Sequence, residues 1–122
     1  MGAFENIEAL GPLRIWDDVV AREIHGQQTT LAVVELEPGA LVPEHNHPSE
    51  QLGLVITGSV EFRVAEETGE LGPGGTWNIP AEIPHEVRAG PEGAVVVDVF
   101  SPTRKADWSG LAREEPRRPR WP

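Results

Sequence analysis

Two histidines in the middle of this chain have a spacing that suits metal binding, because His45 and His47 are separated by a single residue. In an extended chain the side chains alternate, so both imidazoles point to the same side. Gln51 has the same parity if the strand stays regular, whereas its acidic neighbour Glu50 has the opposite parity. A further histidine, His85, follows directly after a proline in a separate strand-like segment. These residues are the first candidates for a metal site.

The composition restricts the classes of protein to which the chain can belong. With 122 residues, 39% of them hydrophobic, and with 13 glycines and 12 prolines, one domain of short elements with frequent turns is expected. The lack of cysteine excludes disulfide frameworks and thiolate metal sites. No stretch has the length of apolar sequence that spans a membrane, and the N-terminus lacks the pattern of a signal peptide. A cytoplasmic protein without membrane contact is therefore expected.

The net charge of −10 is unevenly distributed along the chain. Residues 1–102 hold four Lys/Arg against 17 Asp/Glu, whereas residues 103–122 hold six against three. An acidic body repels the nucleic acid backbone, so no nucleic acid partner is expected. It also repels a free anionic ligand, so an anionic substrate needs a local positive charge such as a metal ion.

Short strand signals at regular spacing predict an all-β fold. Thr29–Leu36 is rich in β-branched residues, and Gln51–Thr57 and Ser59–Val64 flank Gly58 as a predicted tight hairpin. Further predictions are a strand pair over 13–24, a loop over 67–75, and strands over 76–80, 85–89 and 94–100. Because no segment between them has a helical period, an antiparallel sandwich or barrel is favoured. Residues 1–108 are expected to form the domain, and the basic, proline-rich tail 109–122 is expected to be disordered or to lie over a neighbour.

A second group of polar residues follows near the end of the β-rich region. Asp98 interrupts an apolar strand and shares a face with Phe100, opposite Val97 and Val99. A buried carboxylate without a partner is costly, so Asp98 lies either on the solvated side of an edge strand or at a polar pocket. In the second interpretation it is an acid–base residue at a barrel mouth near the metal, with Arg104 placed to bind a substrate carboxylate.

Residues 39–58 and 74–89 resemble the two sequence motifs of the cupin superfamily. The first has Gly39, five residues, the H-x-H pair, three residues, the usual position of an acid and, after six more residues, Gly58. The second has Gly74, five residues, Pro80, and His85 five positions further on. The departures from the family pattern are Gln51 for the usual glutamate, Glu82 for a glycine and Ala89 for an asparagine.

The resemblance implies a small antiparallel β-barrel, the double-stranded β-helix or jelly roll, which is frequently a homodimer. It also implies that one divalent transition metal is held by His45, His47, Gln51 and His85. Imidazole ligands suit Zn, Ni, Mn, Fe and Cu, and an amide oxygen is a weaker, neutral donor. Four neutral ligands leave the charge of the ion uncompensated, which favours Lewis-acid chemistry on anions. The fourth histidine, His25, is expected to be a surface or hydrogen-bonded residue.

The order H-x-H-x-x-E-Q, I-P-x-x-x-P-H and D-V-F-S-P-x-R is similar to that of the KdgF-type cupins, from about Thr29 to Trp108. Members of that group convert 4,5-unsaturated monouronates, released from pectin or alginate, into linear keto forms. The resemblance implies that Asp98, Phe100 and Arg104 are active-site residues. In that case Asp98 moves a proton, Arg104 holds the substrate carboxylate, and Phe100 and Trp77 wall the pocket.

Two other functions are compatible with the sequence. The same ligands suit a cupin dioxygenase that uses Fe, Cu or Ni. A non-catalytic cupin that binds a sugar or another metabolite is the third class. The leading hypothesis is a metal-dependent enzyme that opens the ring of a small, anionic, sugar-like substrate.

Overall fold

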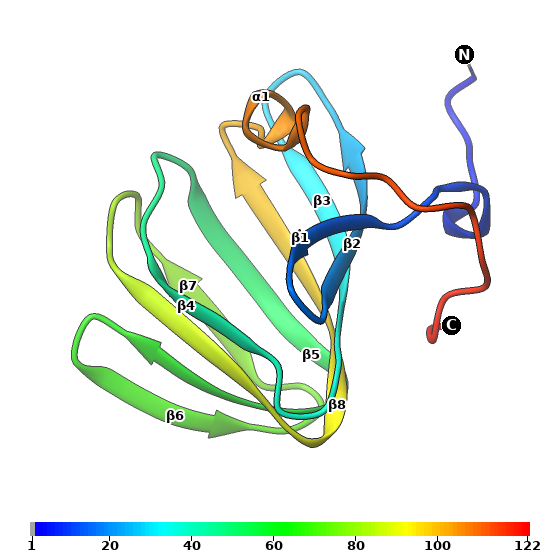
Figure 1. Cartoon of the computed structure of the whole chain (residues 1–122). Coiled ribbons are helices and arrows are strands. Elements are labelled where there is room, and N and C mark those ends of the chain that lie inside the picture. Colours follow the sequence, from blue (N-terminus) through cyan, green and yellow to red (C-terminus); the bar gives the residue numbers. More distant parts are fainter. Residues whose placement is uncertain (1) are drawn as a thin grey trace.

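Alternating apolar residues and closely spaced turns fold the chain into β-strands with very little helix. The computed structural model describes residues 2–122 (Figure 1). Its strands are β1 (Leu13–Trp16), β2 (Val19–His25), β3 (Thr30–Leu36), β4 (Leu41–His45), β5 (Glu50–Val64), β6 (Glu67–Leu71), β7 (Thr76–Ile79) and β8 (His85–Ser101). A 3-10 helix, η1 (Ile7–Ala9), precedes them, and one helical turn, α1 (Lys105–Trp108), follows. Neither helix of this part of the chain has the length and hydropathy needed to cross a membrane.

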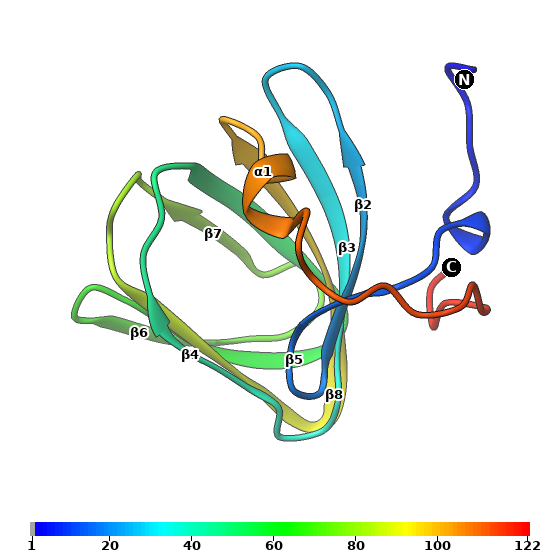
Figure 2. The same ribbon diagram turned by 45° about the horizontal axis from the view of Figure 1, so that its top comes forward.

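The strands pair antiparallel in the order β1-β2-β3-β8-β5-β6, with β4 also paired to β8 and β7 also paired to β5. The second half of β8 pairs with β3 and with the first half of β5, and its beginning pairs with β4 and with the second half of β5. The two long strands therefore belong to both walls of a barrel, as the two views show (Figure 1, Figure 2). This is the antiparallel barrel that the sequence predicted. The expected strands over 29–36 and 76–80 and the expected strand pair over 13–24 are also confirmed.

Gly58 does not lie in a tight hairpin, so that part of the prediction is wrong. β5 continues through this residue, and its register with β8 shifts between Gly58 and Val60. Both strands bend here, where Gly58 and Gly93 have φ angles of 78° and 76°. A Cβ on Gly58 would lie 2.0 Å from the carbonyl oxygen of Gly93, so only glycine permits the approach. A barrel corner and a hairpin turn both require glycine, which explains the error.

Two further differences come from strand pairing that is not local. The predicted loop over 67–75 contains β6, whose largely exposed residues pair with the end of β5. Because β6 buries almost no side chain, its sequence lacks the apolar alternation that would have predicted a strand. The separate strands predicted over 85–89 and 94–100 are one strand, β8, which continues through Gly90 and Pro91.

The inner face of the barrel wall places polar residues above an apolar core. One cross-strand row consists of Thr30, Phe100, Gln51 and Ile79, and the next consists of Ala32, Asp98, Gly53 and Trp77. Val34 and Val96 pair in the following row, and both are buried. The polar groups are therefore carried by central, paired strands, which hold their backbones in fixed positions.

The basic tail lies against β2 and β3 of its own chain. Arg22, which is 1% exposed, donates from Nη1 to Glu35 (2.5 Å) and from Nη2 to the carbonyl oxygen of Arg117 (3.1 Å). The backbone N–H of Arg120 donates to the same carboxylate (3.1 Å), and Pro119 is buried. The tail thus covers a buried ion pair on the outer surface of the barrel.

Replacing Glu35 by alanine is expected to lower the free energy of unfolding by about 3–5 kcal/mol, because the charge of Arg22 then stays buried without its partner. Urea unfolding followed by circular dichroism measures the loss. The matched control is Glu37→Ala, which removes an exposed ion pair with Arg120 and should cost at most about 1 kcal/mol. Equal losses in the two variants would contradict the assigned role of the buried pair.

Candidate functional site

A cavity of about 250 Å³ lies inside the barrel, with residues of α1 in its lining. Its deep wall is apolar and includes Val34, Val96, Val60 and Phe62. The polar lining consists of His45, Gln51, His85, Asp98, Arg104 and Asp107. The structure therefore brings candidate metal ligands and residues of the second polar group, Asp98 and Arg104, to one cavity, although the two groups are far apart in the sequence.

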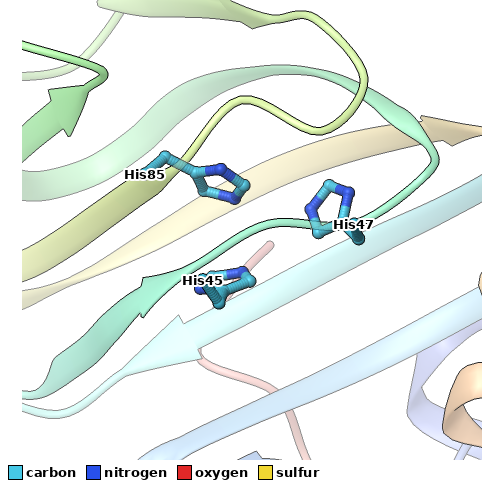
Figure 3. Close-up of side chains that lie close together, drawn as sticks. All are labelled: His45, His47 and His85. Carbon is cyan, nitrogen blue, oxygen red and sulfur yellow. The ribbon is translucent and has the colours of Figure 1, made fainter.

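The three histidines come together at the junction of two strands. His45 is the last residue of β4, His85 is the first residue of β8, and the two are paired in the register of these strands. His47 lies in the loop between β4 and β5. One ring nitrogen of each histidine lies within 4.8 Å of the other two, and the rings face a common space (Figure 3). This arrangement forms a possible metal site.

The hydrogen bonds of the three imidazoles leave the Nε2 lone pair of each ring available for a metal. Each Nδ1 contacts a backbone carbonyl oxygen, with distances of 2.8 Å from His45 to Pro43, 2.8 Å from His47 to Ser49 and 2.9 Å from His85 to Ile83. A carbonyl oxygen only accepts, so Nδ1 carries the hydrogen and Nε2 keeps its lone pair. Such bonds orient metal-binding histidines in known sites.

The electrostatic environment keeps these imidazoles neutral. Burial lowers the pKa of all three, and lowers that of His85 to about 4. Nε2 of His85 is buried and has no hydrogen-bond partner among residues 2–122. A metal ion requires unprotonated imidazoles. The donor set and the unpartnered nitrogen therefore fit a divalent transition metal.

Gln51, at the beginning of β5, lies between the histidines and Asp98. Its Oε1 is 3.1 Å from Nε2 of His47, and its Nε2 donates to Oδ1 of Asp98 (2.9 Å). Because Nε2 of His47 has no hydrogen, two acceptors face each other, and a cation would satisfy both. Strand parity does not explain this approach, because a loop separates His45 from β5 and no regular strand connects His45 with Gln51. The role of Gln51 as a fourth ligand stays a prediction.

Asp98 is buried on the inner face of β8, and it is 7% exposed. Its Oδ1 accepts hydrogen bonds from Nε1 of Trp77 (2.8 Å) and from Gln51. Burial raises the pKa of Asp98 to about 6, although these two bonds and the charge of Arg104 act in the opposite direction. Since β8 is paired on both sides here, the alternative of a solvated edge-strand residue is wrong.

Arg104 reaches the same cavity from the segment after β8. Its guanidinium lies 5.2 Å from the ring centroid of Phe100 and 5.3 Å from that of Trp108, distances typical of cation–π contact. Its Nε donates to Asp107 (2.9 Å), and burial lowers its pKa. The ring of Phe100 also packs edge-on against His47, with centroids 5.8 Å apart. Arg104, Phe100 and Trp108 thus line the same cavity as His45 and His85, and His47 packs against Phe100.

Sequence reasoning did not identify Asp107, Trp108 or Gly53 as parts of this site. Asp107 and Trp108 lie on α1, which is too short to leave a periodic signal. Gly53 was a possible signal, because a glycine inside a strand often marks a close approach of another group. His25 lies outside the triad, and its Nδ1 is 2.8 Å from Oγ1 of Thr30.

The chain belongs to the cupin family. The sequence model of that family, described as a cupin domain, matches residues 32–100. Among curated proteins the chain is similar to the oxalate decarboxylase OxdC of Bacillus subtilis (strain 168), with 30% identity over 89 residues. That match covers 68% of this chain but only 23% of the decarboxylase, so the chain corresponds to about a quarter of its relative.

Solved structures share the fold over most of the chain. KdgF from Halomonas sp. has a TM-score of 0.80 at 24% identity, covering 88% of this chain and 99% of that protein. An RmlC-like cupin from Shewanella frigidimarina also has a TM-score of 0.80, at 20% identity, covering 88% and 96%. The expected membership of the cupin superfamily and the resemblance to KdgF are confirmed. At these identities the structural similarity extends to the fold alone.

Proposed function

We propose that this cupin is a metal-dependent enzyme that converts 4,5-unsaturated monouronates into their linear keto forms. The observation that carries the proposal is the position of Asp98, whose buried carboxylate lies in one cavity with neutral histidines and with Arg104. Such a reaction needs a site for substrate oxygens, a cation for the substrate carboxylate and a group that moves a proton. The sequence resemblance to KdgF-type cupins supports this choice of substrate.

The binding roles follow from the side-chain groups of the cavity that are available to bind a metal or a substrate. The three histidines would hold the metal with Gln51, and a bound divalent ion would supply a Lewis acid for the substrate oxygens. Arg104 would bind the substrate carboxylate through its Nη groups, which have no acceptor among residues 2–122, while Asp107 holds its Nε. The rings of Phe100 and Trp108 keep the guanidinium in place.

The proton transfers fall to Asp98. Ring opening breaks the bond between C1 and the ring oxygen, and the C1 hydroxyl loses its proton as a carbonyl forms there. The former ring oxygen keeps the electron pair of the broken bond as an enolate on C5, and the enolate becomes a ketone when C4 gains the proton taken from the C1 hydroxyl. No net electrons or atoms are exchanged. With a pKa of about 6, Asp98 can both accept and return a proton near neutral pH. Trp77 and Gln51 bind Oδ1, which leaves Oδ2 for the substrate.

The experiment that tests this function follows the ultraviolet absorbance of an unsaturated monouronate, whose conjugated double bond disappears in the reaction. The metal-loaded protein should accelerate the loss in proportion to its concentration, and the metal-free protein should not. No acceleration with Zn, Ni, Mn or Fe would reject the proposal. Oxygen uptake instead would indicate a dioxygenase, and saturable binding without turnover would indicate a binding protein.

We further propose that the protein is a homodimer, as the cupin resemblance implies. Side chains of β2, β3, β5 and β8 that alternate with the inner rows point outward. Among them Ile24, Leu31, Leu52 and Leu54 are 53%, 38%, 44% and 37% exposed. Ile24 pairs with Leu31, and Leu31 and Leu52 both pair with Val99, so this outer apolar row is continuous. Two copies with a net charge of −10 each repel one another, so an uncharged row suits their contact.

The double variant Leu31→Glu/Leu52→Glu is expected to be a monomer, because it places like charges on both sides of the proposed contact. Size-exclusion chromatography with light scattering measures the mass. Leu41→Glu is the matched control, since Leu41 is 36% exposed but lies on β4, away from the outer apolar row. A monomeric wild type, or a double variant that stays dimeric, would contradict the proposed contact.

A further inference from the structure

The amide of Gln51 lies between two acceptors, Nε2 of His47 and the carboxylate of Asp98, and it donates to the carboxylate. Its oxygen faces Nε2 of His47, and its NH₂ group donates to Oδ1 of Asp98. The flipped amide would place its oxygen against the carboxylate, where no hydrogen is available for a bond. The carboxylate of Asp98 therefore requires a hydrogen-bond donor at position 51.

The carboxylate of Asp98 cannot move away from this donor, because a second group fixes the same oxygen. Oδ1 also accepts from Nε1 of Trp77, and both residues pair with Gly53 in the strand register. A Cβ on Gly53 would lie 2.5 Å from Oδ1 of Asp98 and 2.3 Å from Nε1 of Trp77. The missing side chain of Gly53 thus provides the space in which the carboxylate and the indole meet.

From this geometry we infer that Gln51 and Asp98 form a matched donor–acceptor pair, in which position 51 carries an amide because its NH₂ group holds Asp98. A glutamate there would have no hydrogen to donate when ionised. It would also bring a second carboxylate into contact with the first in a buried site, where like charges repel strongly. The pair accounts for the departure from the usual glutamate at this position.

Gln51 is then a positioning residue for Asp98, and so are Trp77 and Gly53. They fix Oδ1 and leave Oδ2 directed to a substrate. The pair itself depends only on the geometry of the site, whereas its catalytic meaning rests on the proposed function. The test is therefore designed so that each can fail separately.

The test is a double-mutant cycle in the metal-free protein, with Gln51→Glu, Asp98→Asn and the double variant, followed by urea unfolding at pH 8. Asparagine keeps an oxygen for Trp77 but removes the charge that repels Glu at position 51. We expect Gln51→Glu to raise the unfolding equilibrium constant at least about tenfold more with Asp98 than with Asn at position 98. Equal effects in the two backgrounds would overturn the inference.

A spectroscopic measurement separates positioning from a general loss of stability. The indole N–H resonance of Trp77, assigned with Trp77→Phe, should shift in Gln51→Glu and in Gly53→Ala, while the metal stoichiometry of Gly53→Ala stays that of the wild type. An unshifted resonance in both variants would contradict the shared site on Oδ1. If the wild type has no activity on unsaturated uronates but the cycle shows coupling, the proposed function fails and the matched pair stands.

Discussion

The Asp98→Asn variant is expected to turn over the unsaturated uronate roughly 10²–10⁴-fold more slowly than the wild type, while it binds the same amount of metal. The turnover falls because the reaction needs a group that accepts and returns a proton, which an amide cannot do. Asparagine keeps an oxygen for the donors on Trp77 and Gln51, so the local structure should persist. The kcat is measured by the loss of substrate absorbance, and the metal content by elemental analysis.

The matched control for this variant is Glu50→Gln, which removes one carboxylate immediately before Gln51. Glu50 is exposed and contributes nothing to the lining of the cavity, so its kcat should equal that of the wild type. Full activity of Asp98→Asn would reject the proton-transfer role. If Asp98→Asn instead contains less metal than the wild type, the substitution disturbs the histidines.

The His47→Ala variant is expected to lose stoichiometric metal, with its affinity falling by at least about 100-fold. The physical reason is the small number of ligands, since the three histidines provide all the nitrogen donors of the candidate site. Equilibrium dialysis of the purified protein against Zn or Ni, followed by elemental analysis, measures the affinity.

His25→Ala provides the control for that measurement, because it removes the fourth histidine without changing the triad. His25 is hydrogen-bonded to Thr30, and neither residue lines the cavity, so the variant should keep the metal stoichiometry of the wild type. Circular dichroism should show that both variants are folded. If His47→Ala retains one metal per chain with unchanged affinity, the metal-site assignment is wrong.

The local sequence determined the fold class of this protein and identified its candidate histidine ligands. Apolar alternation and turn residues are local signals, and they predicted an antiparallel barrel with most of its strands. The spacing of the H-x-H pair indicated a metal site, and the resemblance of the second motif to that of cupins added His85 to the predicted ligands. Asp98 was also recognisable, since a single acid within a run of valines requires a special environment.

The tertiary structure decided how these segments pair and what surrounds each polar group. Gly58 became a barrel corner instead of a hairpin, and β8 became one strand, because pairing depends on partners far away in the sequence. The same pairing placed Asp98 on a central strand instead of a solvated edge. The tertiary structure also brings Arg104, Asp107 and Trp108 to the cavity, where they lie with residues of several strands.

Position 51 shows the division most clearly. The sequence alone identified Gln51 as the residue that occupies a ligand position usually held by glutamate. Only the folded chain places its NH₂ group on a carboxylate that lies on a different strand. A residue type is a local property, whereas the need for a donor arises from a neighbour that the strand register supplies. The sequence therefore determined which residues could do chemistry, and the register of the barrel decided which of them act on one another.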